Sequence, residues 1–296
     1  RGGEPGFALL DHIVAGLPAA GRLDEGERHR LVELAREGAR RAASSAAWAN
    51  AERYLATALV LASGLPPEPA RSFVLRRAHA EALALIGRHD EGDREFAALL
   101  EHPLEPSELG RLVARRLEIL ASQDRHDEAL VLGLATLRRL GLALRPSRAA
   151  LLLAALRAWR GIRKLGHAGL LALPDVADVR VAAQLLIADA MQTSAFLIRR
   201  ELSVELNAVQ VSLVVRHGFH PVAPRTLGQF GILLVVLGRP LEAAQLAEWA
   251  LELAERAPSE LRPRVETSAR LFVWPHSRPI VGSLRGLEDL YERALA

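Results

Sequence analysis

The chain has 296 residues, half of them apolar and only 4% aromatic, and it contains no cysteine. The lack of cysteine excludes disulfides, thiolate metal sites and cysteine nucleophiles, and it favours a reducing compartment, the cytoplasm. The isoelectric point near 10.1 accompanies a formal net charge of only +3, and every basic residue except Lys164 is arginine, so the charge does not favour nucleic acid as a partner.

The apolar residues are mostly alanine and leucine, which are strong helix formers, and this composition favours an all-α fold. The longest apolar run, residues 149–156, is much shorter than the roughly 18 residues of a membrane span, so no span is predicted. The first residues, RGGEPGFALL, contain neither an initiator methionine nor the charged-then-apolar order of a signal peptide. We therefore expect the chain to be a piece of a longer protein.

The predicted helices come mostly in pairs. Residues 1–22 are a leading segment with a short helix at 7–17. Pairs follow at 24–43 with 48–62, at 69–87 with 91–101, and at 106–122 with 127–140. The middle, 142–220, is irregular, with helices at about 146–165, 177–196 and 199–217 and a loop at 166–174. Pairs resume over 221–296, at 225–237 with 241–256 and at 260–273 with 283–295.

A repeated tetrapeptide supports this pairing. Arg-His-Asp-Glu at 88–91 recurs 37 residues later at 125–128, each time between two apolar segments of helical period. The spacing is close to the roughly 34 residues of the tetratricopeptide repeat (TPR). The prediction is a right-handed α-solenoid of antiparallel helix pairs, TPR-like, with about 12–14 helices over residues 23–296 and regular pairs at 23–141 and 221–296.

Each position of the predicted pairs has a physical interpretation. Small residues early in the second helix allow close crossing: Ala51, Gly92, Ala129 and Ala243. Four residues later come side chains expected to face the next pair: Leu55, Phe96, Gly133 and Ala247. The Asp-Glu of the repeated tetrapeptide is predicted to cap its helix by accepting backbone N–H groups. His89 and His126 occupy a position where TPR proteins place an aromatic ring, so packing is expected of them.

Motifs for catalysis or cofactors are missing from the sequence. There is no phosphate loop, no G-x-G-x-x-G and no H-E-x-x-H, and Gly282 to Gly286 has the wrong spacing for a nucleophile elbow. His217 and His220 are three residues apart in a predicted turn, which is a weak metal signal without a third ligand. The sequence therefore predicts no enzyme activity, no metal site and no cofactor.

One region has an unusual charge pattern. From Ala129 to Pro174 there is no Asp or Glu, whereas eight residues are basic. Four of them can line one helix face beside Trp159: Arg157, Arg160, Arg163 and Lys164. Such a face suits an anionic partner, such as an acidic domain or a phosphate backbone. The alternatives are a solvated face whose other side, with Leu152, Leu156 and Leu165, is buried, and a helix that lies in a membrane interface.

The order of segments resembles a known architecture. Six segments carry the resemblance: ANAERYLATAL at 49–59, GRHDE at 87–91, QDRHDEAL at 123–130, GLALRPSRAALL at 141–152, LPDVADVRVAA at 173–183 and SLVVRHG at 212–218. Together they resemble the TPR-like helical region of large bacterial signalling proteins. In those proteins a serine/threonine kinase and a STAND-type AAA ATPase precede the array, and a GAF domain with a histidine kinase or cyclase follows it.

The resemblance implies a non-catalytic scaffold in the cytoplasm that binds a protein partner, neighbouring domains of the parent chain or a small-molecule effector, and transmits binding to ATPase or kinase modules. Arginines on first helices would line its groove: Arg76, Arg111, Arg115 and Arg116. Two alternatives stay open. One is the effector-binding array of a STAND-type transcription regulator. The other is an all-α enzyme, which predicts a closed cavity with converging carboxylates or histidines.

Overall fold

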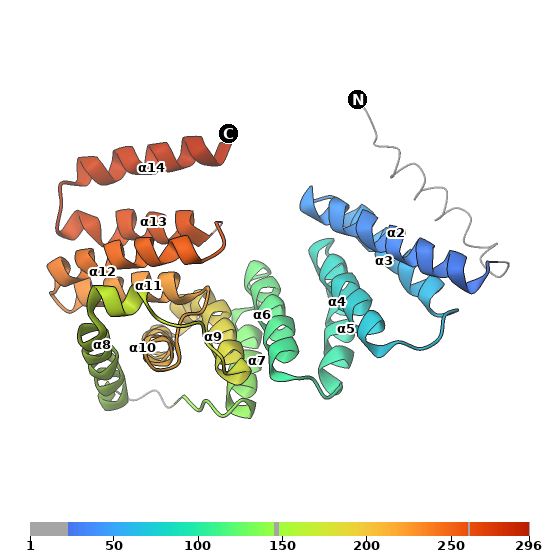
Figure 1. The fold of residues 1–296 in the computed structure, drawn as a ribbon, viewed down its shortest axis with the longest axis horizontal. Coiled ribbons are helices and arrows are strands. Elements are labelled where there is room, and N and C mark those ends of the chain that lie inside the picture. The colour runs from blue at the N-terminus through green and yellow to red at the C-terminus, as the bar shows by residue number, and fades with distance from the viewer. Residues whose placement is uncertain (1–22, 145–147, 260, 296) are drawn as a thin grey trace. The chain divides into compact units, whose positions relative to one another are not determined.

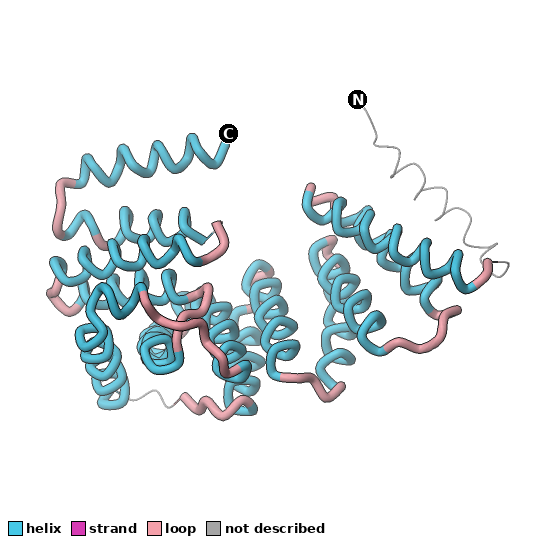
Figure 2. Tube along the Cα trace, in the orientation of Figure 1, coloured by secondary structure: helices cyan, strands magenta, loops and turns pink. Residues whose placement is uncertain are grey.

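The computed structural model describes residues 23–144, 148–259 and 261–295 (Figure 1). The described part of the chain is 81% helical, with thirteen α-helices and no β-strand (Figure 2). This confirms the predicted all-α class. The short helix predicted at 7–17 lies outside the described residues.

The chain divides into two compact units, Arg1–Leu104 and Glu105–Ala296. The boundary falls inside the segment 23–141, for which the sequence predicts regular helix pairs. In the first unit the helices are α2 (Glu25–Ser44), α3 (Trp48–Ala62), α4 (Pro69–Leu85) and α5 (His89–Glu101). α2 packs on α3, α3 on α4 and α4 on α5. Alanines and leucines fill the core between them, together with Tyr54, whose side chain is 1% exposed.

The second unit contains nine α-helices among its described residues: α6 (Pro106–Ser122), α7 (His126–Arg139), α8 (Arg148–Leu171), α9 (Val179–Ile198), α10 (Arg200–His217), α11 (Ala223–Val236), α12 (Pro240–Leu253), α13 (Leu261–Phe272) and α14 (Ile280–Leu295). The sequence predicts a loop at 166–174, which is wrong for residues 167–171. The backbone kinks at Gly166, with φ of 64°, but α8 continues to Leu171 because Leu170 enters the core.

The helices of the second unit pack in a series from which α8 is displaced. α6 and α7 both contact α9, although α8 lies between α7 and α9 in the sequence. The contacts then run from α9 to α10, α11 and α12, and from α11 to α13 and α14. α8 packs on α10 and on α12, and Figure 1 shows it beside α10, away from α6 and α7. It is therefore an added helix outside the series of neighbouring pairs.

The turns inside the pairs share one backbone geometry. The residue after the helix C-cap has positive φ in four of them: Ala46 (57°), Gly87 (87°), Asp124 (57°) and Gly238 (74°). The next residue donates its backbone N–H to the carbonyl five residues earlier, as Arg88 does to Leu83 at 2.9 Å and Arg239 does to Leu234 at 2.9 Å. This is the Schellman closure of a helix, in which a left-handed residue reverses the chain. The repeated spacing in the sequence thus reflects a repeated turn.

The repeated tetrapeptide does not cap its helix as predicted. In α5 and α7 the side chain of the N-cap residue makes no capping hydrogen bond, although Asp and Glu do stand in the first turn, as predicted. Instead the arginine pairs with the glutamate three residues later, at 2.6 Å for Arg88 with Glu91 and 2.6 Å for Arg125 with Glu128. The arginine before α12 also pairs with the glutamate three residues after it, at 2.8 Å. The tetrapeptide is thus a local ion pair placed at the positive end of a helix dipole.

Small residues do mark the close crossings, as predicted. Ala51, Ala129 and Ala243 are at most 1% exposed. At Gly92 an added Cβ would lie 3.1 Å from the Ala80 carbonyl oxygen of the partner helix. The histidines differ from each other: His126 is half-buried and lies 3.1 Å from the Ser194 hydroxyl, whereas His89 is exposed. The packing role predicted for His89 is therefore wrong.

The segment 174–176, between α8 and α9, lies against Phe219, which follows α10. We refer to this segment as the strap. The Val176 N–H donates to the Phe219 carbonyl at 2.8 Å, and the Phe219 N–H donates to the Pro174 carbonyl at 2.7 Å. Gly218 allows this approach, because a Cβ there would lie 2.2 Å from the Pro174 oxygen and its φ is 115°. Arg256 holds the strap from the other side. Its guanidinium donates to the carbonyls of Leu171 and Leu173 and to Asp175, and it lies 4.1 Å from the centre of the Phe219 ring.

Among the described residues, α9 is the one helix long and apolar enough to cross a membrane by length and composition. In the most apolar 18-residue window of α9, 56% is buried against other helices. Such burial is typical of a core helix, because a core helix and a membrane span share the same composition.

Candidate functional site

The added helix α8 carries the exposed features of this protein that best suit a binding site. Its packing face consists of small and branched residues: Ala155, Ala158 and Ile162 are at most 8% exposed. At Gly161 an added Cβ would lie 2.9 Å from a methyl group of Val215 on α10. α8 therefore lies close against α10, and its opposite face is left open.

The predicted basic face lies on that open side. Arg157, Arg160, Arg163 and Lys164 are all exposed, as their spacing on one helix face suggested. Within the described part of the chain, none of the four cations forms an ion pair or a hydrogen bond. α8 itself carries no Asp or Glu. These charges are therefore available to a negatively charged partner.

Three leucines share this exposed face, which corrects the expectation that Leu152 and Leu156 are buried. Leu152 is 60% exposed, Leu153 46% and Leu156 52%. They fall in the first turns of α8, whereas the four cations fall in the later turns. Leu165, expected on the same buried side, is half-buried and packs on the core. The open face of α8 is thus apolar at its N-terminal half and cationic at its C-terminal half. We refer to residues 152–164 on this side as the α8 face.

Trp159 does not belong to the α8 face. The side chain is half-buried against the core, and the Arg239 guanidinium lies 5.2 Å from its ring centre. The kinked end of α8 is anchored nearby, since His167 lies 2.8 Å from a Glu252 carboxylate oxygen and stacks on Trp249 at 5.4 Å. These contacts fix α8 on α12 and leave the ring of Trp159 covered.

The predicted groove arginines are divided between the two units and differ in exposure. Arg76 lies in the first unit, where its Nε atom is 3.0 Å from a Glu95 oxygen. Arg111, Arg115 and Arg116 lie on α6 in the second unit. Of these Arg111 is exposed, Arg115 pairs with Glu118 at 2.8 Å, and Arg116 is only 6% exposed. Burial removes Arg116 from any surface that a ligand could reach.

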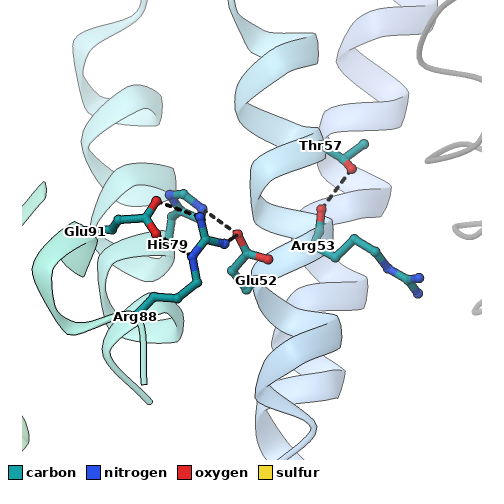
Figure 3. Close-up of polar contacts among 6 residues, drawn as sticks. All are labelled: Glu52, Arg53, Thr57, His79, Arg88 and Glu91. Carbon is teal, nitrogen blue, oxygen red and sulfur yellow. Dashed lines mark hydrogen bonds and ion pairs between the residues drawn. The ribbon is translucent and has the colours of Figure 1, made fainter. Parts of the chain in front are cut away.

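A polar cluster in the first unit joins two helix pairs (Figure 3). Glu52 of α3 lies 3.3 Å from His79 of α4 and 2.9 Å from Arg88, and the same arginine binds Glu91 of α5. The Glu52 and His79 side chains are each 16% exposed. Two hydrogen bonds from Arg88 hold the pKa of Glu91 below its ordinary value. The cluster satisfies its own charges, so its geometry indicates a structural clasp.

Sequence reasoning missed a buried polar layer between α9, α10 and α11. The Gln192 amide donates to Gln210 at 2.9 Å and accepts from the Ser203 hydroxyl at 2.9 Å. Asp189 binds Arg225 at 2.9 Å, and burial raises the pKa of this carboxyl. The available signal was a set of polar residues inside otherwise apolar helices. Such groups require internal partners, and they fix how the helices are paired.

The described residues show no arrangement typical of a metal centre. No group of three His, Asp or Glu side chains is placed to hold a metal ion in the described part of the chain. His220 uses its Nδ1 atom to accept the Val222 N–H at 3.3 Å, and burial lowers its pKa. An open cavity of about 180 Å³ is lined by Leu134, Arg138, Ala143, Leu144, Arg199 and Leu202. Its lining contains no carboxylate or histidine.

Comparisons with known proteins add no assignment: no family model, no curated protein and no solved structure matches this chain.

Proposed function

We propose that this chain is a non-catalytic interaction scaffold, a TPR-like α-solenoid that binds an acidic protein partner through the α8 face. One observation carries the proposal. Four exposed cations, which form no ion pair with any residue that the structure describes, stand beside three exposed leucines on a helix that contains no carboxylate. An acidic partner would offer the cations opposite charge, and its apolar side chains would remove the leucines from water.

The composition of the α8 face favours a protein over a phosphate backbone. Leucine side chains gain by leaving water, at about 25 cal/mol for each Å² buried, and a nucleic acid backbone offers them no apolar surface. Three of the four cations are arginines, whose planar guanidinium binds carboxylates through two parallel hydrogen bonds. A partner with carboxylates beside apolar side chains therefore matches the whole face.

The resemblance of the sequence supplies the larger context of the proposal. In that context the scaffold is a cytoplasmic part of a multidomain signalling protein, and partner binding changes the state of an ATPase or kinase module. A STAND-type transcription regulator is the rival. The parent sequence distinguishes the two, because kinase and GAF motifs accompany the first and a helix-turn-helix motif accompanies the second.

Capture of partners by variant chains tests the proposal. The face variant R157E/R160E/R163E reverses three charges of α8, and the control R30E/R36E/R94E reverses three exposed arginines of the first unit. We expect the face variant to capture its protein partner at least about tenfold less than the wild type, because like charges then oppose each other. The control should capture as the wild type does. Equal capture by both variants would overturn the proposal.

A further inference from the structure

A second helix, α14, presents a face that resembles the α8 face in shape and opposes it in charge. The small residues Ser283 and Gly286 form its buried side, and an added Cβ on Gly286 would clash with the Arg270 guanidinium of α13. Its other side is exposed: Ile280 is 57% exposed, Val281 55%, Leu284 53% and Tyr291 67%. Glu288 and Glu292 are exposed on the same side. We refer to residues 280–292 on this side as the α14 face.

The two faces have the same spacing. Leu152, Leu153 and Leu156 start the α8 face, and Ile280, Val281 and Leu284 start the α14 face in the same register. Eight residues after the first apolar residue comes Arg160 in one face and Glu288 in the other. With about 100° of rotation per residue, these positions lie near the centre of each exposed stripe. Both faces are thus apolar first and charged later, with opposite signs at the centre.

We propose that the α14 face of one copy of this chain docks in parallel on the α8 face of a second copy. This rests on the proposed function, because it names the partner of the same α8 face. In the parallel arrangement leucines meet Ile280, Val281 and Leu284, and Arg160 meets Glu288. An antiparallel arrangement would place the cations of α8 against the apolar turns of α14, which desolvates charge without a partner.

The edges of the two faces are also compatible. In a parallel pair of helices the edge of one stripe meets the opposite edge of the other. Glu292 therefore falls beside Arg163, and Tyr291 falls beside Lys164, where a cation can lie over the ring. Arg157 and Arg285 occupy matching positions, and so they fall on opposite sides of the interface. Like charges are thus kept apart while opposite charges meet.

The contact is heterologous, since it joins two different surfaces. A chain that has docked its α14 face still presents its own α8 face to a third copy. Such contacts produce rings or open chains of subunits, whereas a two-fold dimer uses the same patch on both partners. Association should therefore continue beyond two copies as the concentration rises.

Sedimentation equilibrium of the whole chain at up to about 100 µM, where micromolar complexes are populated, tests this docking. Two variants reverse one face each: R160E/R163E on α8 and E288K/E292K on α14. We expect each variant alone to self-associate at least about tenfold more weakly than the wild type. An equimolar mixture of the two should associate again, because each acidic face then meets a basic face. Added salt should weaken both assemblies by screening.

Matched controls separate docking from a general attraction between opposite charges. The variants R30E/R94E and E101K/E201K carry the same charge changes at exposed positions elsewhere. Each control should self-associate as the wild type does. A wild type that stays monomeric, or a face-variant mixture that associates no more than either face variant alone, would overturn the docking. Neither result affects the proposed function, which fails only if the α8 reversal leaves partner capture unchanged.

Discussion

Replacing Gly218 by alanine should destabilise the second unit more than the same change at Gly238. At Gly218 the backbone φ is 115° and a Cβ would lie 2.2 Å from the Pro174 oxygen, so the strap must move away. The unusual backbone conformation costs about 1–3 kcal/mol in a residue with a side chain. Losing the two strap hydrogen bonds adds about 1 kcal/mol each. The expected loss in the free energy of unfolding is therefore about 3–5 kcal/mol.

Gly238 provides the matched control. Its φ is 74°, but nothing lies within 4 Å of a Cβ placed there, so Gly238→Ala should cost only about 1–2 kcal/mol. Urea unfolding followed by tryptophan fluorescence and circular dichroism measures both variants. Hydrogen exchange at the Phe219 and Val176 amides should accelerate in Gly218→Ala alone. Equal losses in the two variants, with unchanged exchange at Phe219, would refute the role assigned to the strap.

Three further changes have expected outcomes. Arg256→Lys should lower the free energy of unfolding by about 1–3 kcal/mol, because a single ammonium nitrogen replaces neither the two separate guanidinium nitrogens that bind the three oxygens nor the plane that lies over the Phe219 ring. Arg200→Lys in an exposed position should have no measurable effect in the same urea titration. Ala46→Gly should stabilise the first unit by about 1 kcal/mol, because glycine adopts the φ of 57° at this position without strain. Ala43→Gly inside α2 should destabilise the same unit by about 1 kcal/mol. Thermal melts in which Ala43→Gly is the more stable variant would contradict this prediction. Burial raises the pKa of Asp189, so the folded state favours the neutral form of this carboxyl. The stability that Asp189 contributes is therefore greatest below the ordinary carboxyl pKa, and it is lost as the pH rises through the raised pKa. Asp189→Asn should therefore be more stable than the wild type near pH 7, with an advantage that shrinks on acidification, and a constant difference between pH 4.5 and 7.5 would show that the carboxyl does not titrate in this way.

Most helices of this protein could be predicted because their signals are local. Apolar periodicity and the turns at Gly87, Asp124 and Gly238 place the paired helices within two or three residues of the structure. The path of α8 could not be predicted in this way. Gly166 looks like a helix end in sequence, but the next turn remains helical because Leu170 is buried against helices distant in the chain.

The candidate site was predicted in its charges but not in its apolar part. Spacing alone placed the four cations of α8 on one exposed side. Spacing also suggested that Leu152 and Leu156 are buried, because leucines in an amphipathic helix usually face the core. Ala155, Ala158 and Ile162 pack there instead, since small residues let α8 approach α10 closely. Which apolar stripe is buried depends on the neighbouring helix, and a single sequence does not contain that information.

Because α8 lies outside the series of helix pairs, the residues that it needs for packing and those that it exposes to solvent are different. The residues that attach α8 to the protein lie on one side, and those proposed to meet a partner lie on the other. Substitutions between 152 and 164 on the open side can therefore alter the choice of partner with little loss of folding free energy. Descendants of this protein can acquire new recognition properties on α8 while the pairs beneath it stay unchanged.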